Sequence, residues 1–199
     1  MKKRAVFLDR DGTINRDVGF PSSYDLIEIY SYSFEAVRKI KEADMLAVIT
    51  TNQSGIGRGL IQEKDLHLIH KKLKDTFAEH NIYFDGIYYC PHYLSSSIAR
   101  YNKDCLCRKP NPGRAIQAAA DLNIDMKKSY MVGDKVEDVL FGLNIQAKPI
   151  LVLTGFGQKS LPILEEKGIK PAHVASTLLD AVNWILERER ESIAPKIKG

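Results

Sequence analysis

The chain contains 199 residues, of which 44% are hydrophobic and 27% are charged, and its formal net charge is +4 at pH 7. This composition predicts one domain with a buried core and argues against a disordered chain. The sequence has neither an apolar run of the roughly 18 residues that a membrane span needs nor the basic stripe of a nucleic-acid binder. The few apolar residues before Asp9 are too short a run for a signal peptide, so we expect a cytoplasmic location.

Short apolar runs, typical of buried strands, alternate along the chain with segments of helical periodicity. Strands are expected at Ala5–Leu8, Leu46–Thr50, Gly86–Cys90, Tyr130–Val132, Ile150–Leu153 and Val174–Ala175. Helices are expected at Phe34–Ala43, Glu63–His80, Pro112–Leu122, Val136–Asn144 and Thr177–Arg190, with Asn111 and Ser176 as caps of the third and the last. The alternation predicts a single α/β domain over residues 1–190, built on a doubly wound, mainly parallel sheet, with a frayed tail at 191–199.

Two irregular segments interrupt the alternation. The first, Asn15–Tyr30, follows the first expected strand, and the second, Pro91–Arg108, follows the third. Long irregular segments inside a compact domain tend to be functional. Both are too short to form a large cap domain, so we expect an open site bordered by these two loops.

Polar side chains follow several of the expected strands. They are Asp9 and Asp11 after the first strand, Thr51 after the second, Lys109 near a helix start, and Asp134 and Asp138 after the fourth. Ligands of an open α/β sheet bind at the carboxyl ends of its strands, so these groups are expected to meet. Clustered carboxylates repel one another unless a hard cation lies between them, and Mg²⁺ suits such oxygen ligands. Any one of these acids alone is better explained as a cap or turn residue, but the ordered set predicts a site in which Thr51 and Lys109 hold a phosphoryl group.

A second cluster lies in the loop of residues 90–107. Cys90, His92, Cys105 and Cys107 form a complete set of ligands for a closed structural Zn²⁺. The alternative is three reduced cysteines beside a surface histidine, and the odd number of cysteines argues against a disulfide framework. A bound zinc would pin this loop and, through it, Arg108 and Lys109.

The motifs of the acidic cluster resemble the four motifs of the haloacid dehalogenase (HAD) superfamily. They are Asp9-Arg10-Asp11-Gly12-Thr13, Thr51-Asn52-Gln53-Ser54, Lys109-Pro110 and Gly133-Asp134-Lys135-Val136-Glu137-Asp138. The resemblance covers essentially the whole domain and implies a Rossmann-like HAD core. It also implies that Asp9 is the nucleophile that forms an aspartyl-phosphate. Asp11 would protonate the leaving alkoxide and later deprotonate the attacking water.

The resemblance also implies how the site holds its ligands. Mg²⁺ would be bound by Asp9, by the backbone carbonyl of Asp11 and by Asp134. The side chains of Thr51, Arg108 and Lys109 would neutralise charge on the phosphoryl group. Asp138 would orient Lys135 or a metal-bound water.

Within the superfamily, the sequence is similar to the heptose-1,7-bisphosphate 7-phosphatase family. The similarity is carried by residues 9–15, 51–59, 88–92, 107–110 and 129–135. It implies removal of the 7-phosphate of D-glycero-D-manno-heptose 1,7-bisphosphate in the synthesis of ADP- or GDP-heptose, for lipopolysaccharide core or related glycans. It also implies substrate contacts from Asp17, Val18, Gly19, Phe20, Thr51, Asn52, Gln53, Ser54, Arg108, Lys109 and Lys135. The anomer at C1 stays open.

Two other functions are weighed against this one. Histidinol-phosphate phosphatase shares the motifs and a zinc loop, but its loop is typically shorter. The twelve-residue spacer here carries Arg100 and Lys103, which could bind a second phosphate or equally be solvated. A zinc-containing nucleic-acid-binding or end-processing protein is the other alternative, although Tyr88 and Tyr89 fall in an expected buried strand, which favours core packing. We expect a monomer that acts on a small phosphosugar.

Overall fold

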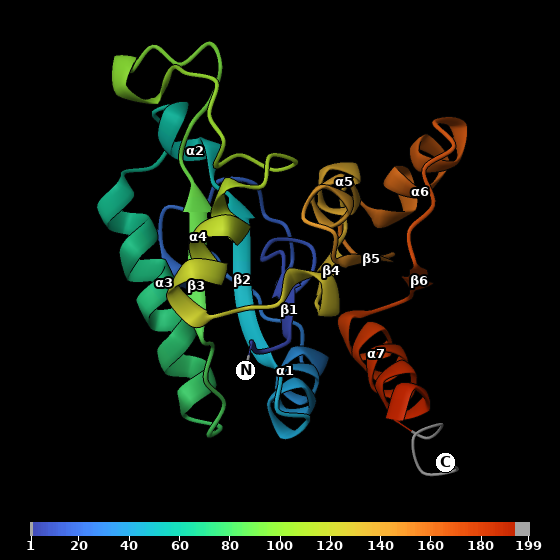
Figure 1. The fold of residues 1–199 in the computed structure, drawn as a ribbon. Helices are drawn as coiled ribbons and strands as arrows, with labels where there is room; N and C mark the ends of the chain where they lie inside the picture. The colour runs from blue at the N-terminus through green and yellow to red at the C-terminus, as the bar shows by residue number, and fades with distance from the viewer. Residues whose placement is uncertain (1, 194–199) are drawn as a thin grey trace.

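The computed structural model describes residues 2–193, and the side chains of residues 2–191. Its centre is a six-stranded sheet of order β3-β2-β1-β4-β5-β6, in which every neighbouring pair is parallel (Figure 1). The strands are β1 (Ala5–Leu8), β2 (Leu46–Asn52), β3 (Gly86–Cys90), β4 (Tyr130–Gly133), β5 (Lys148–Val152) and β6 (His173–Ala175). The predicted doubly wound parallel sheet is confirmed.

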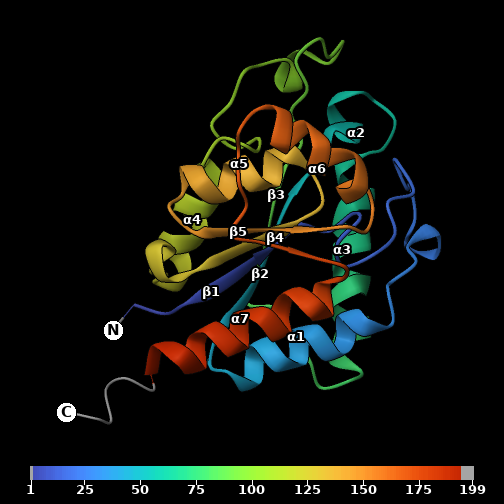
Figure 2. The same ribbon diagram turned by 90° about the vertical axis from the view of Figure 1, so that its right-hand side faces the viewer.

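Helices cover both faces of the sheet (Figure 2). They are α1 (Tyr32–Glu42), α2 (Ser54–Gly57), α3 (Glu63–Ala78), α4 (Gly113–Leu122), α5 (Val136–Asn144), α6 (Gly157–Glu166) and α7 (Leu178–Ile193). Side chains of a strand alternate between faces, and β1 illustrates this. Val6 and Leu8 pack with α1, α3 and α7, whereas Ala5 and Phe7 pack with α4 and α5. No helix within residues 2–193 is long and apolar enough to cross a membrane.

The structure corrects several local predictions about helices. Helix α6 escapes the sequence prediction because it begins at Gly157 and contains Pro162, two residues that normally interrupt a helix. Asn111 does not cap α4, since its side chain donates to the carbonyl of Cys105 (2.8 Å). Thr177 rather than Ser176 stands at the start of α7, where its hydroxyl accepts from the backbone N–H of Asp180 (3.2 Å).

Helix α7 continues to Ile193, so the first residues of the expected frayed tail are helical. The rest of that tail, 194–199, lies outside the described residues.

Strand β3 is an edge strand, and this corrects the expectation that Tyr88 and Tyr89 are buried in the core. Both are only half-buried. The hydroxyl of Tyr88 donates to Asp121 (3.0 Å) and that of Tyr89 donates to Glu63 (2.8 Å). Their polar ends are therefore engaged by helices α4 and α3.

The strand order places the candidate site. Strand β1 lies between β2 and β4, with Leu8 opposite both Ile49 and Val132. The strands β1 to β3 build one half of the sheet, and after β3 the chain crosses to the other side of β1 to form β4. The switch point therefore lies between β1 and β4, and ligands bind in the crevice outside such a point. The loop after β3 rises from this same carboxyl end of the sheet (Figure 1).

Candidate active site

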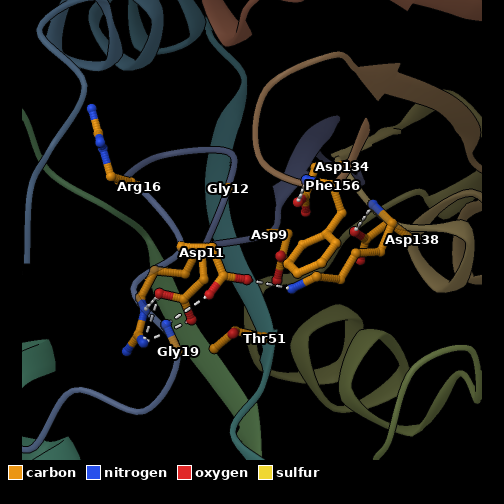
Figure 3. Close-up of polar contacts among 12 residues, drawn as sticks. Asp9, Asp11, Gly12, Arg16, Gly19, Thr51, Asp134, Asp138 and Phe156 are labelled. Atoms are coloured by element: carbon orange, nitrogen blue, oxygen red, sulfur yellow. Dashed lines mark hydrogen bonds and ion pairs between the residues drawn. The ribbon is translucent and has the colours of Figure 1, made fainter. Parts of the chain in front are cut away.

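Three carboxylates meet at the switch point. One oxygen from each of Asp9, Asp134 and Asp138 lies within 4.8 Å of the others, and all three side chains are buried. Asp9 follows β1, and its N–H donates to the carbonyl of Val132 in β4 (2.9 Å), which fixes it beside the turn that carries Asp134. Figure 3 shows Asp9 with Asp11 on one side and Asp134 and Asp138 on the other.

A buried lysine compensates part of this charge. The Lys109 ammonium lies 2.7 Å from Asp9 Oδ1 and 2.6 Å from Asp138 Oδ1, and it donates to the carbonyl of Thr50 (2.8 Å). Although burial works in the opposite direction, Asp138 and Asp9 raise the pKa of Lys109, which therefore stays charged. The backbone of Lys109 is held on both sides by the side chain of Asn52 (3.0 and 3.1 Å).

Asp138, which was expected to orient Lys135 or a metal-bound water, contacts two lysines of the site in different ways. Its carboxylate contacts the Lys109 ammonium and accepts from the backbone N–H of Lys135 (3.0 Å) at the start of α5. The Lys135 ammonium instead pairs with Asp17 in the loop after β1 (2.9 Å). Asp138 therefore orients Lys109, and the side chain of Lys135 links the two halves of the site.

Asp134 is enclosed by backbone. Its Oδ2 accepts from the N–H of Phe156 (2.7 Å), whereas its buried Oδ1 has no partner among the described residues. Gly12 and Gly155 have positive φ angles of 88° and 54°, and a Cβ on either would lie 2.2 Å from Asp134 Oδ2. Only glycine fits at these two turns. The two glycine turns lie against Asp134, whose Oδ1 is a buried acceptor without a donor among the described residues.

The electrostatics of the acids call for a cation. Burial, together with the neighbouring Asp138, raises the pKa of Asp9 to about 6, although Lys109 opposes the change. Burial and the charges of Asp9 and Asp138 raise the pKa of Asp134 to about 8. Hard oxygen donors and an unpartnered carboxylate oxygen are what Mg²⁺ binds in proteins, so the residues present fit this ion.

Asp11 has a different environment. It accepts from Arg10 (2.8 and 2.9 Å), from Asn15 (3.0 Å) and from Gln53 (2.8 Å). Burial works to raise the pKa of Asp11, but the Arg10 guanidinium and these hydrogen bonds lower it below its ordinary value. The carboxylate form of Asp11 is therefore the resting form in this structure.

A cavity of about 410 Å³ opens above the acids. It is lined by Asp9, Asp11, Asp17, Gly19, Phe20, Thr51, Asn52, Gln53, Ser54, Arg108, Lys109, Lys135, Glu137, Asp138 and Phe156.

The cavity therefore brings together most of the residues that were expected to contact substrate. Val18 is not among them and is 42% exposed. Arg100 and Lys103 also lie outside the lining. The guanidinium of Arg100 lies over the ring of Tyr101, 4.7 Å from its centroid.

The cysteine cluster lies in the loop that ends next to Arg108, one of the cavity-lining residues. One donor atom from each of Cys90, His92, Cys105 and Cys107 lies within 4.8 Å of the others. The Cys107 sulfur is 3.1 Å from that of Cys90 and 3.2 Å from that of Cys105, distances too long for a disulfide. Hydrogen bonds from Cys90, Cys105 and His92 lower the pKa of Cys107 to about 5, although burial opposes them. Four soft donors around one point fit a tetrahedral Zn²⁺.

The loop that carries these cysteines also reaches the cavity. Arg108 lines the cavity, and its guanidinium donates to the backbone carbonyl of His92 (3.4 Å). A residue of the cysteine cluster, His92, is therefore in direct contact with the cavity-lining Arg108.

Several residues of the site were not predicted from the sequence. Phe156 and Glu137 line the cavity, and Arg10 and Asn15 hold Asp11. A signal for Phe156 was present, because Thr154–Gly157 is a glycine-rich turn after a strand, like the turns after β1 and β4. Arg16, by contrast, pairs with Glu28 (3.1 Å) and points away from the acids (Figure 3).

A cavity beside paired acids, at the switch point of a doubly wound parallel sheet, is the arrangement expected of a HAD-type hydrolase, and the comparisons with known proteins agree. A family profile described as HAD-hydrolase-like matches residues 106–181. The chain is 41% identical to a protein of Pasteurella multocida over 89% of this chain and 94% of that protein. It is 42% identical to a protein of Escherichia coli strain K12 over 94% and 95%. Both are named D-glycero-beta-D-manno-heptose-1,7-bisphosphate 7-phosphatase.

Solved structures agree with these relatives. The fold is similar to the crystal structure of D,D-heptose 1,7-bisphosphate phosphatase from B. bronchiseptica in complex with magnesium and phosphate. The TM-score is 0.81 and the identity 31%, over 93% of this chain and 99% of that one. A second phosphatase of this name, from Burkholderia thailandensis, has a TM-score of 0.67 at 28% identity, over 92% of this chain and 99% of that one. The chain belongs to the heptose-1,7-bisphosphate 7-phosphatase family of the HAD superfamily.

Proposed function

We propose that this protein is a Mg²⁺-dependent phosphatase that removes the 7-phosphate of D-glycero-β-D-manno-heptose 1,7-bisphosphate through an aspartyl-phosphate on Asp9. The observation that carries the chemistry is the buried group of Asp9, Asp134 and Asp138, in which Asp9 and Asp138 both pair with the Lys109 ammonium. The substrate and its β anomer come from the names of relatives that align over nearly the whole chain. The product would serve ADP- or GDP-heptose synthesis for lipopolysaccharide core or related glycans, in the cytoplasm.

The chain's own residues divide the reaction into two displacements. A carboxylate oxygen of Asp9 attacks phosphorus in line, and the bond to the sugar oxygen breaks as the new bond forms. Asp11 supplies a proton to the departing alkoxide. An arriving phosphate dianion raises the pKa of a nearby carboxylate by like-charge repulsion, which favours this proton-bearing form of Asp11. Water then attacks the phosphorus of the aspartyl-phosphate while Asp11 accepts a proton from the water. The bond between phosphorus and the Asp9 oxygen breaks, which regenerates Asp9 and releases inorganic phosphate.

The other lining residues would bind and orient the substrate. Lys109, Arg108 and Lys135 converge on the cavity and would neutralise the phosphoryl oxygens, with the Thr51 hydroxyl as a further donor. Asp9 and Asp134, with the carbonyl of Asp11, would hold Mg²⁺. When bound, this ion supplies positive charge that offsets the acids and polarises the phosphoryl group.

The test of the substrate compares three compounds with one enzyme preparation. We expect phosphate release with Mg²⁺ to be fastest from the β-heptose 1,7-bisphosphate. The α anomer and histidinol phosphate should be slower, because they differ in the groups that reach the cavity rim. The measurement is kcat/KM for each compound, with an EDTA-treated sample as the control. A preference for histidinol phosphate would overturn the substrate assignment and leave the phosphatase chemistry in place.

We also infer that Cys90, His92, Cys105 and Cys107 bind one structural Zn²⁺. All four ligands come from the chain, so the ion would have no open position for catalysis. Its role would be to pin the loop of residues 90–107 and thereby hold Arg108 at the cavity.

Removal of zinc should lower the activity of the enzyme as well as loosen the loop of residues 90–107. We expect about one Zn²⁺ per chain by elemental analysis, and none in a Cys105→Ser, Cys107→Ser variant. The variant should lose roughly 10- to 100-fold in kcat/KM, because an unpinned Arg108 no longer meets the phosphate. Ser97→Ala, an exposed change in the same loop, is the matched control and should keep both zinc and activity. Fully active wild-type protein that is free of zinc would contradict the inference.

A further inference from the structure

Arg10 lies between the two acids of the first motif, but it does not line the cavity. Its side chain is fully buried. Its Nε and Nη2 donate to Asp11 at 3.1, 2.9 and 2.8 Å. A buried guanidinium cannot lose its proton, so it has to be held by acceptors on several sides. The remaining nitrogen, Nη1, lies 3.1 Å from Nε2 of His70 in helix α3.

The direction of this last hydrogen bond follows from chemistry. A guanidinium has only donors, so Nε2 of His70 accepts, and the neutral ring carries its proton on Nδ1. Burial and the charge of Arg10 lower the pKa of His70 to about 3, in agreement with a neutral ring. The ring is only 6% exposed, and it packs against Tyr89 with centroids 5.7 Å apart at 61°. Burial and packing against Tyr89 therefore fix the orientation of the imidazole, with Nε2 as the acceptor that faces Arg10.

We propose that His70 is a positioning residue for the reaction: it holds Arg10, and Arg10 holds the Asp11 carboxylate in the orientation that proton transfer requires. The inference rests on the proposed role of Asp11. Without the imidazole acceptor, Arg10 Nη1 would be a buried charged donor with nothing to bond, which is costly. The guanidinium would shift or draw in water, and Asp11 would move with it. Proton transfer falls steeply with such small displacements.

A purely structural role for His70 predicts a different outcome. If His70 only filled space under α3, its loss would weaken the fold and slow every substrate alike. A positioning role acts on the proton given to the leaving group. It therefore matters for an alkoxide, which must be protonated, and little for p-nitrophenolate, which leaves as the anion.

The experiment follows the first displacement alone, with enzyme in excess over substrate in rapid mixing. One substrate is p-nitrophenyl phosphate. The other is whichever of the β-heptose bisphosphate and histidinol phosphate the wild type turns over faster, since both release an alkoxide. We expect His70→Leu to slow alcohol release roughly 10- to 100-fold but p-nitrophenolate release by less than about 3-fold. His70→Gln retains an acceptor and should restore alcohol release to within about 5-fold of wild type.

Two further variants separate the possible results. Leu73→Ala removes apolar packing from the same buried side of α3 but keeps the imidazole that bonds Arg10, and should lower the thermal midpoint while slowing both substrates equally or not at all. Equal losses on both substrates in His70→Leu, or full activity on both, would overturn the inference.

Asp11→Asn tests the proposed function on which this inference rests. If Asp11→Asn releases alcohol at the wild-type rate, the role of Asp11 fails and the inference with it. If Asp11→Asn is slow and His70→Leu is not, the inference alone fails.

Discussion

Asp9→Asn is expected to lower kcat by about 10⁴-fold or more, because an amide oxygen cannot form the aspartyl-phosphate. The fold should survive. Asparagine has the same shape as aspartate, and its Oδ1 can still accept a hydrogen bond from Lys109. The Lys109 ammonium also retains its contacts with the Asp138 carboxylate and the Thr50 carbonyl. The measurements are phosphate release at saturating substrate and the thermal midpoint.

The control for this substitution is Asp75→Asn. Asp75 lies on the exposed face of α3, where it pairs with Lys71, and the change should leave activity unaltered. Acid quenching of wild-type turnover should also trap phosphate on the chain, and Asp9→Asn should trap none. Residual turnover in Asp9→Asn at a few per cent of wild type would rule out a covalent Asp9 intermediate.

Lys109→Met is expected to damage both stability and catalysis. The ammonium of Lys109 is buried between Asp9 and Asp138, and its removal leaves two buried carboxylates without compensation. Breaking a buried pair in this way costs about 3–5 kcal/mol. Loss of a cation at the phosphoryl group should also lower kcat by roughly 10²- to 10³-fold. Urea unfolding in EDTA measures the first effect, and steady-state kinetics with Mg²⁺ measures the second.

A second substitution separates the two effects of Lys109. In the double variant Lys109→Met, Asp138→Asn, one of the stranded charges is neutralised, so part of the lost free energy of unfolding should return. Activity should not return, since the cation is still absent. Lys71→Met, on the exposed side of α3, is the control for the loss of a lysine and should change neither. Wild-type stability in Lys109→Met would show that Lys109 does not balance the acids.

The sheet, and with it the acidic site, could be predicted from the sequence because both depend on local patterns. Apolar runs marked all six strands of the described structure, and strand ends placed Asp9, Thr51 and Asp134 at one edge. Motif spacing grouped the four candidate zinc ligands, which the fold brings within 4.8 Å. Helix α6 was missed because Gly157 and Pro162 break the local pattern, and packing of Leu164 against Val139 and Leu151 outweighs that weak propensity.

The pairing of the buried charges in the site depends on the three-dimensional fold. Sequence patterns placed Asp9 directly after one buried strand and Asp134 directly after another, and the pairing of β1 with β4 then brings the two acids together. Local patterns could not show that the Asp138 carboxylate would pair with the Lys109 ammonium, or that His70 would reach Arg10. These contacts join residues 29 and 60 positions apart. Their partners are chosen by the desolvation of buried charges, which a local pattern does not encode.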